Sequence, residues 1–399
     1  MAEIHFTDFN KLDLSRLPTP CFVVDEVAVE RNLKKLSKLE QLSGAKVLHA
    51  LKAFSMWQLA PLTRQYVSGT CSSGLQEAQL AEEFYGGQVH VFSVAYKEKE
   101  LEQLLQFASH IVFNSCSQLM RYKDLCFTAL KNRPELRFGL RINPMHSEAE
   151  VAIYDPCAPG SRLGVNRKTL DSYMEVAEFR QAFSLISGIH FHTLCEQNFM
   201  PLQRTLSVVE SDFFDILTDM EWINFGGGHH ITREDYQFDE LVKCIQSFSE
   251  AHHLKVFVEP GEAVAIGTGV LCGEVLDVAE NNPLQVILDV SATCHMPDTL
   301  EMPYRADISG AGVMGEKRYG YRLGGPTCLA GDVIGDYSFD RALEVGDRLV
   351  FEDMAHYTMV KTTTFNGTQL PSLAIWNSET DALKVVKSFG YEEFKSRLS

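Results

Sequence analysis

The chain has 399 residues, of which 45% are hydrophobic and 22% are charged, and its formal net charge at pH 7 is −17. A chain of this length is too long for one small core, so we expect two domains. The acidic balance argues against nucleic acid and anionic membranes as partners, because both select basic surfaces.

The N-terminal segment shows no targeting signal. Residues 1–20, MAEIHFTDFNKLDLSRLPTP, lack the basic and apolar regions of a secretory signal peptide. No stretch approaches the roughly 20 apolar residues of a membrane span. The ten cysteines form no CxxC pair, and most lie in apolar runs, where a thiol behaves as a small hydrophobe. We therefore expect a soluble, cytoplasmic protein with reduced cysteines.

Strand-like runs alternate with helical patterns from about residue 45 to 260. The eight strand candidates are 45–51, 66–71, 89–94, 110–115, 136–142, 185–191, 221–226 and 255–260. Helix-like stretches such as 75–85 and 99–108 lie between them. This is the element count of an α/β (β/α)8 TIM barrel, which we expect for residues 22–265. A doubly wound sheet is the alternative, because periodicity does not show whether a sheet closes.

The pattern changes after residue 261. Residues 270–293 and 342–359 read as β runs joined by turn residues, with few helical repeats. Residues 20–25 add one extended segment before the barrel. We therefore expect a β-rich C-terminal domain of residues 266–399, completed by about residues 1–21.

Two polar residues that follow apolar strand candidates indicate a cofactor. Lys52 follows VLHAL (47–51), and Glu259 follows KVFV (255–258). A lysine at the end of a buried strand can form a Schiff base if desolvation lowers its pKa. A carboxylate at another strand end can keep a pyridine nitrogen protonated. The pair predicts a site for pyridoxal 5'-phosphate (PLP), whose protonated ring is an electron sink.

Other strand ends fit the same site, since functional groups of a TIM barrel lie at the carboxyl ends of its strands. The ring of His192 would stack on the cofactor. Gly226, Gly227 and Gly228 would leave backbone N–H groups accessible to the phosphate. Each feature alone has an ordinary explanation, as a surface lysine, a core histidine or a turn; their shared placement favours the site.

The pair His229-His230 suggests a metal. Adjacent residues project in different directions, however, and no third ligand follows at a recognisable spacing. We expect no metal here.

The order of the motifs resembles that of one enzyme family. HALKAF, GIHFHTLCE, NFGGGHH and VEPGEA are followed by ATCHMPDTLEMPYR, GPTCLAGD and HYTMVKTTTFNG. This series, over about residues 20–367, is similar to that of carboxynorspermidine/carboxyspermidine decarboxylase, a fold-type III PLP decarboxylase like the ornithine and diaminopimelate enzymes. The resemblance implies an alanine racemase-like barrel with a β-domain, assembled as a homodimer with shared active sites.

The resemblance also implies a role for single residues. Lys52 would bear PLP, His192 would stack on it and Glu259 would hold its pyridine nitrogen. The glycines 226–228 and Tyr357 would contact the phosphate.

Three residues of the resemblance concern the partner subunit. Cys328, in GPTC, would reach into the partner's active site and protonate the carbon that has lost CO2, which is acid catalysis typically worth about 10²–10⁴-fold. Arg162 and Asp332 match a pair that bridges subunits in ornithine enzymes.

Three positions depart from the ornithine and diaminopimelate patterns. Glu262 stands where those enzymes usually have a phosphate-binding arginine. Leu329 replaces an acid that meets the distal end of the substrate, and Thr70 replaces an acid near the lysine in the ornithine enzymes. These changes favour the carboxynorspermidine group and put in doubt any phosphate contact from residue 262.

The implied substrate is a small cationic carboxylated polyamine, which would be decarboxylated to norspermidine or spermidine. A cationic tail needs acids, and residues 296–307 supply them. Asp298 or Glu301 is our candidate partner of the distal amine, and a solvated turn is the equally weighted alternative.

Other functions stay open. An ornithine or diaminopimelate decarboxylase shares the fold and cofactor. A PLP racemase typically pairs the ring nitrogen with arginine, whereas this chain offers Glu259. A non-catalytic homologue tends to lose the lysine or the cysteine, and this chain keeps both Lys52 and Cys328. A cofactor-free Schiff-base aldolase has no use for Glu259 and the three glycines.

Overall fold

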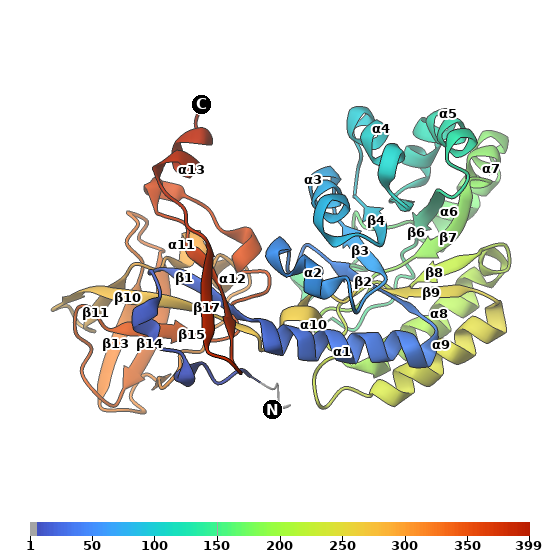
Figure 1. Cartoon of the computed structure of the whole chain (residues 1–399). Helices are drawn as coiled ribbons and strands as arrows, with labels where there is room; N and C mark the ends of the chain where they lie inside the picture. Colours follow the sequence, from blue (N-terminus) through green and yellow to red (C-terminus); the bar gives the residue numbers. More distant parts are fainter. Residues whose placement is uncertain (1–5, 150) are drawn as a thin grey trace. The chain divides into compact units, whose positions relative to one another are not determined.

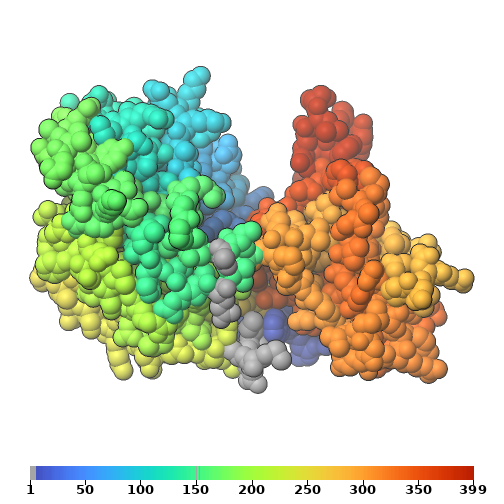
Figure 2. All heavy atoms as spheres, turned by 180° about the vertical axis from the view of Figure 1, so that it is seen from behind, coloured from blue at the N-terminus to red at the C-terminus, as the bar shows by residue number. Residues whose placement is uncertain are grey.

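The computed structural model describes residues 6–149 and 151–399, which form two compact units (Figure 1). The first unit is Asn32–Val264, and the second combines the described residues up to Arg31 with Ala265–Ser399. In the space-filling view, blue N-terminal residues accordingly lie beside orange C-terminal ones (Figure 2).

The boundary between the units differs from the one that the sequence analysis placed at residue 22. Strand β1 (Cys21–Asp25) pairs with β10 (Gly269–Ala279) and β16 (Ser372–Asn377), so it belongs to the second unit. The division falls within α1 (Glu26–Ser43). Residues 1–5, which the sequence analysis assigned to the β-rich domain, lie outside the described residues.

Eight parallel strands close the first unit into a barrel in sequence order. They are β2 (Lys46–Ala50), β3 (Gly69–Ser72), β4 (Gln88–Phe92), β5 (His110–Phe113), β6 (Arg137–Arg141), β7 (Ile186–His190), β8 (Trp222–Asn224) and β9 (Lys255–Val258). Pairing of β9 with β2 completes the ring. Every strand overlaps its predicted range, which confirms the TIM barrel, and the closure excludes a doubly wound sheet.

Helices connect the barrel strands (Figure 1). They are α2 (Ala60–Thr63), α3 (Leu75–Leu80), α4 (Glu98–Phe107), α5 (Cys116–Asn132), α6 (Arg167–Met174), α7 (Ala177–Phe183), α8 (Phe199–Leu217) and α9 (Phe238–His252), with short 3-10 turns at Trp57–Leu59 and Ala152–Tyr154. Helix α4 buries Leu101, Leu104 and Leu105, the i, i+3, i+4 spacing of an amphipathic helix. The predicted helix 75–85 is α3 followed by a π-helical turn, Ala81–Tyr85.

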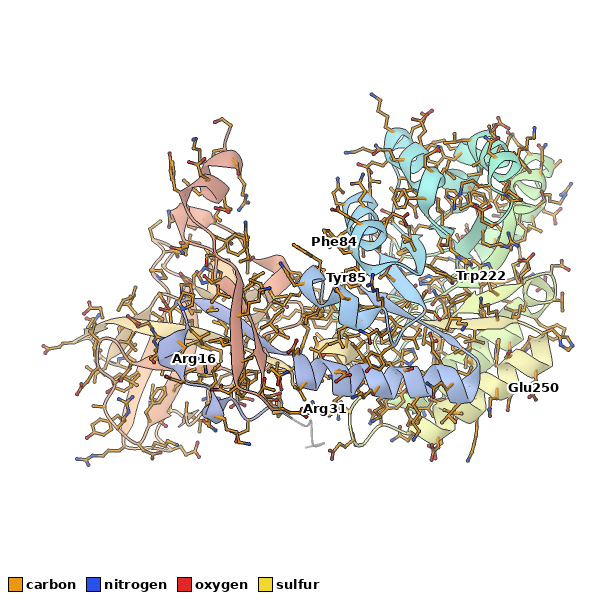
Figure 3. All side chains as sticks on the ribbon, in the orientation of Figure 1. Arg16, Arg31, Phe84, Tyr85, Trp222 and Glu250 are labelled. Carbon is orange, nitrogen blue, oxygen red and sulfur yellow. The ribbon has the colours of Figure 1, made fainter. Side chains whose placement is uncertain are left out.

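Trp222 belongs to a buried hydrophobic cluster of the barrel unit (Figure 3). Its ring lies where Gly139 and Gly188 have no side chain: a Cβ atom on Gly188 would come within 2.0 Å of the indole, and one on Gly139 within 2.5 Å. Buried Leu48, Val112 and Phe257 complete this cluster. The barrel is thus a packed core, and chemistry is left to the ends of its strands.

The second unit is built on a nine-stranded sheet in the order β12-β14-β13-β11-β10-β1-β16-β17, with β15 paired to β10. The strands not yet located are β11 (Gln285–Leu288), β12 (Gly312–Val313), β13 (Tyr319–Gly324), β14 (Val333–Phe339), β15 (Arg348–Phe351) and β17 (Ala382–Lys387). Its helices are short: α10 (Glu262–Ala265), at the boundary, α11 (Ala292–His295), α12 (Asp298–Glu301) and α13 (Tyr391–Ser396), with 3-10 turns at Phe9–Lys11, Leu14–Arg16, Met359–Lys361 and Phe365–Gly367. The expected β-rich domain is confirmed.

The core of this unit combines N-terminal and C-terminal residues. Phe9 and Trp376 contact each other with ring centroids 5.5 Å apart, and Cys21 lies opposite Cys272 on neighbouring strands. Among residues 6–149 and 151–399, no helix has the length and apolarity to cross a membrane.

Candidate active site

The barrel places its candidate residues at one rim, because each follows the carboxyl end of a parallel strand. Lys52 follows β2, His192 follows β7, the glycines 226–228 follow β8, and Glu259 follows β9. Strand β2 is buried as expected, but the Lys52 side chain is exposed, since the strand ends at Ala50 and the chain turns there. The barrel residues alone do not enclose this amine.

Glu259 is buried and meets three uncharged donors. Asn224 Nδ2 donates to Oε1 at 2.7 Å, His190 Nε2 lies 3.3 Å from Oε2, and the Cys71 thiol donates to the same carboxylate. Burial by itself raises the pKa of Glu259, but His190, Cys71 and then the Lys52 ammonium outweigh it and hold the pKa well below its usual value. Glu259 is therefore ionised at neutral pH.

His192 is half-buried and tied to the glycine loop, the segment 226–228. Its Nδ1 accepts a hydrogen bond from Gly227 N at 2.9 Å, which places the proton of the neutral ring on Nε2. Burial first, and the Lys52 ammonium second, hold the pKa of His192 well below its ordinary value. The residue thus presents a neutral aromatic ring with a fixed tautomer.

Each glycine of the loop is required by close packing. A Cβ atom would lie 2.5 Å from the Phe191 carbonyl oxygen at Gly226, 2.3 Å from the Glu259 carbonyl oxygen at Gly227 and 2.1 Å from the Leu194 carbonyl oxygen at Gly228. Gly226 and Gly228 also have φ of +72° and +80°, values that other residues rarely adopt.

The N–H groups of two loop residues are already engaged, contrary to our expectation that all three face a phosphate. Gly226 N donates to Asn224 Oδ1 at 2.8 Å, and Gly227 N donates to His192 Nδ1. A phosphate contact through this loop therefore rests on Gly228.

Arg141, the last residue of β6, was not among the site residues expected from the sequence. The side chain is buried, its Nη2 donates to the His192 carbonyl oxygen at 3.2 Å, and its guanidinium carbon lies 4.6 Å from the centre of the Phe92 ring. Burial lowers its pKa to about 10, so it stays charged at neutral pH. The missed signal was a charged residue near the end of an apolar strand candidate, the same signal that identified Lys52.

His229 and His230 have partners other than a metal. His229 Nδ1 lies 3.4 Å from the Tyr236 hydroxyl, and His230 Nδ1 accepts from Arg233 Nη1 at 2.9 Å. His230 Nε2 also lies 3.4 Å from the carboxylate of Glu262, the residue that replaces a phosphate-binding arginine. No group of three or more metal-ligating side chains occurs in the described part of the chain.

Cys328 lies between β13 and β14, on an exposed segment with two anchors. Its backbone N–H donates to Asn366 Oδ1 at 2.9 Å, and the hydroxyl of Thr327 donates to Asp332 Oδ2 at 2.7 Å. Asp332 is buried and also accepts from the hydroxyl of Ser291 at 2.9 Å. Asp332 thus anchors the loop within its own unit, and the subunit-bridging role that the resemblance implies for it stays a prediction.

Asp298 and Glu301 begin and end α12, and both pair with one lysine. Lys361 Nζ contacts Asp298 Oδ1 and lies 2.7 Å from Glu301 Oε2. Burial opposes the charge of Lys361, but the hydrogen bonds to the two acids outweigh it and raise its pKa. The candidate acids for a cationic tail already hold a cation of the chain itself.

Tyr357 is half-buried and has φ of +49°. Its carbonyl oxygen accepts from the backbone of Lys361 at 3.2 Å. The structure thus brings together Lys52, His192, Glu259 and the glycine loop in the first unit. The second unit contains Cys328, Tyr357, Asp298 and Glu301.

Known proteins match nearly the whole chain. A sequence model for the family described as "Pyridoxal-dependent decarboxylase, C-terminal sheet domain" matches residues 21–355. The carboxyaminopropylagmatine decarboxylase of a Synechocystis species is 43% identical over 96% of both chains. The carboxynorspermidine/carboxyspermidine decarboxylase of Campylobacter jejuni is 37% identical over 96% of this chain and 99% of its own.

Solved structures agree. The carboxynorspermidine decarboxylase of Campylobacter jejuni, complexed with norspermidine, has a TM-score of 0.85 at 36% identity and covers 96% of this chain and 100% of its own. The diaminopimelate decarboxylase of Helicobacter pylori, complexed with L-lysine, has a TM-score of 0.79 at 20% identity, covers 96% of this chain and 98% of its own, and shares the fold.

Proposed function

The chain belongs to the pyridoxal-dependent decarboxylases, and we propose that it decarboxylates carboxynorspermidine, carboxyspermidine or both. The observation that carries this proposal is the likeness, over almost the entire chain, to a decarboxylase solved with norspermidine. The product of each reaction is the corresponding polyamine, norspermidine or spermidine. The substrate is a cationic carboxylated polyamine.

The barrel residues fit the cofactor of this family. Glu259 is an anion whose hydrogen-bond donors Asn224, His190 and Cys71 are uncharged, so its charge suits a protonated ring nitrogen. Bound PLP supplies a cationic ring that takes up the electrons left when CO2 departs. In our proposal, Lys52 holds the cofactor covalently and His192 offers its neutral ring to the cofactor face.

We infer further that Gly228 and Tyr357 bind the phosphate. Glu262 contributes no positive charge there, because its side chain is an acid. Its carboxylate lies beside His230 instead.

We propose a homodimer with shared active sites, in which Cys328 serves the partner subunit as proton donor. Support comes from the thiol's exposure and from the hydrogen bonds that hold its loop, which fit a group offered to another chain. There the thiol delivers a proton to the carbon that has lost its carboxylate.

A reducing compartment, and hence the cytoplasm, is part of the proposal. All ten cysteines are free thiols, including Cys21 and Cys272, which face each other across an antiparallel strand pair. Such a pair stays reduced in the cytosol and is prone to oxidation outside it.

Carboxyaminopropylagmatine is the second candidate substrate. A relative that bears this name is 43% identical to the chain. Its agmatine part ends in a guanidinium group, which is cationic like an ammonium group. A planar guanidinium prefers paired carboxylate contacts that a point-like ammonium does not need.

The experiment that tests the function is CO2 release by the PLP-loaded protein. Carboxynorspermidine, carboxyspermidine, carboxyaminopropylagmatine, ornithine and meso-diaminopimelate are compared in parallel, with Lys52→Ala as the control. Turnover of carboxynorspermidine or carboxyspermidine supports the proposal, and the ratio of their kcat/KM values shows which of the two is preferred. Turnover of carboxyaminopropylagmatine alone selects the second candidate. Turnover of ornithine or diaminopimelate alone contradicts both.

A further inference from the structure

Three polar residues end neighbouring strands of the barrel in one register row. Arg141 pairs with His190 between β6 and β7, and His190 pairs with Asn224 between β7 and β8. All three are buried, and two of them contact Glu259, which follows the next strand. The row therefore forms a floor of polar groups beneath the rim that carries the candidate cofactor residues.

Asn224 has no freedom to turn its amide. Its Oδ1 accepts from Gly226 N at 2.8 Å, so the NH2 group must face the other way, where it meets Glu259 Oε1 at 2.7 Å. A flipped amide would place two donors together at Gly226 and two acceptors together at Glu259. The glycine loop thus fixes the orientation of the Asn224 amide, and this amide in turn fixes one oxygen of Glu259.

His190 contacts the other carboxylate oxygen of Glu259, Oε2, and its ring is held in place by packing. Phe92 stacks on the imidazole with centroids 5.3 Å apart and planes 22° from parallel, and the Arg141 guanidinium covers Phe92. Nε2 lies 3.3 Å from Glu259 Oε2, whereas buried Nδ1 has no hydrogen-bond partner among the residues that the structure describes. A neutral ring protonated on Nε2 satisfies both atoms best, because a proton on Nδ1 would be buried without an acceptor. Burial likewise lowers the pKa of His190, against the attraction of Glu259.

We propose that His190 is a positioning residue for the ring nitrogen of the cofactor: as a neutral donor, it fixes the Glu259 carboxylate without cancelling its charge. An arginine or lysine in this place would form an ion pair and leave no net charge for the cofactor. A neutral donor keeps the carboxylate anionic and oriented, so no cation hydrogen-bonded to it competes with a cationic ring nitrogen. This assignment rests on the proposed role of Glu259 toward PLP.

Two substitutions separate the hydrogen bond of His190 from its packing. His190→Gln retains an N–H donor of similar reach and loses the ring, whereas His190→Phe retains the ring against Phe92 and loses the donor. His110→Gln is the matched control, because His110 is another buried histidine of the barrel interior, stacked on His90 instead. If His190→Phe does not fold, His190→Leu replaces it.

The measurements are the dissociation constant of PLP, the pH dependence of the bound cofactor's absorption spectrum and the thermal midpoint of each holoenzyme. We expect His190→Phe to weaken PLP binding by roughly 10- to 100-fold, the usual effect of losing a hydrogen bond to a charged group. We also expect its acid spectral transition to move to higher pH, because Glu259 is then protonated more easily. His190→Gln should stay within about threefold of the unmodified protein, as should His110→Gln.

A double variant tests whether His190 acts through Glu259. In the Glu259→Gln background, adding His190→Phe should weaken PLP binding no further, since the carboxylate it serves is gone. The proposal is overturned if the two losses add, or if His190→Phe binds PLP normally with an unchanged spectrum. It is also overturned if His190→Gln is the more damaging change, which would assign the ring a packing role only. These readouts need no substrate, so they remain decisive even if the protein decarboxylates no carboxylated polyamine.

Discussion

The backbone N–H of Cys328 donates to Oδ1 of Asn366 over a distance of 2.9 Å. Asn366 itself has φ of +58°, a left-handed conformation that asparagine tolerates better than most residues. The bond joins residues that are 38 positions apart, and it fixes the segment that carries an exposed thiol. The loop is held although its cysteine is open to solvent.

Cys328→Ala should bind PLP normally and lower kcat by about 10²–10⁴-fold, because a positioned acid is lost. Products in which the proton has been added at the wrong atom should increase. Asn366→Ala keeps the thiol and removes one of the two anchors of its segment, so its loss of kcat should be smaller. Product analysis and steady-state kinetics measure both effects, and Cys126→Ala, at a buried thiol of α5, is the control. A normal rate and product pattern for Cys328→Ala would remove this cysteine from the mechanism.

Lys52→Ala should abolish turnover and the absorbance of covalently bound cofactor, because no other residue is proposed to form that bond. The absorption spectrum and CO2 release are the two measurements. Lys97→Ala, at an exposed lysine before α4, should leave both unchanged. Activity that survives in Lys52→Ala would refute the assignment.

Asp298→Ala should raise KM for the substrate by roughly tenfold with little change in kcat, as expected when binding common to the ground and transition states is lost. Lys361→Met should lower KM, since the substrate amine no longer competes with Lys361 for the same acids. The pair of KM values is the test. If neither substitution changes KM, the polyamine tail binds elsewhere and the contacts of Lys361 are structural.

Gly227→Ala should destabilise the fold and weaken PLP binding. The new Cβ atom would lie 2.3 Å from the Glu259 carbonyl oxygen, so the glycine loop or the end of β9 must shift. Overpacking of this kind costs about 1–3 kcal/mol of unfolding free energy. Gly74→Ala is the control, because a Cβ atom there has no neighbour within 4 Å. Denaturant unfolding of the two variants compares the costs, and equal values would contradict the close packing of the loop.

The free energy of unfolding should fall as the pH drops below about 6.5. Burial lowers the pKa of His49 to about 4 and that of His110 to about 3, so both stay neutral in the folded protein. The unfolded chain takes up those protons near pH 6.5 and is thereby favoured. Each histidine should contribute about 1.4 kcal/mol per pH unit between pH 6.5 and its folded pKa. Unfolding curves at several pH values measure this slope. His110→Gln should lower the number of protons taken up on unfolding by one, and the slope should fall accordingly.

Much of the barrel could be predicted from the sequence because its determinants are local. An apolar run followed by a turn marks a buried parallel strand, and the residue after the run falls at the rim of the sheet. This rule located all eight strands and placed Lys52, His192, Glu259 and the glycines at strand ends. The same rule was available for Arg141, which lies in none of the quoted motifs, and for Asn224, which begins NFGGGHH but was passed over for the glycines of that motif.

The roles of the neighbours could not be predicted, because they depend on residues that only folding brings together. Glu259 meets His190 across 69 positions of sequence, and Lys361 reaches Asp298 across 63. Nothing in the local sequence indicates that the N–H groups of Gly226 and Gly227 donate hydrogen bonds to Asn224 and His192. The sequence alone therefore determined the strand pattern, the cofactor class and the candidate residues. Only the tertiary structure decided barrel closure, burial and hydrogen-bond partners, because these depend on register and packing between distant segments.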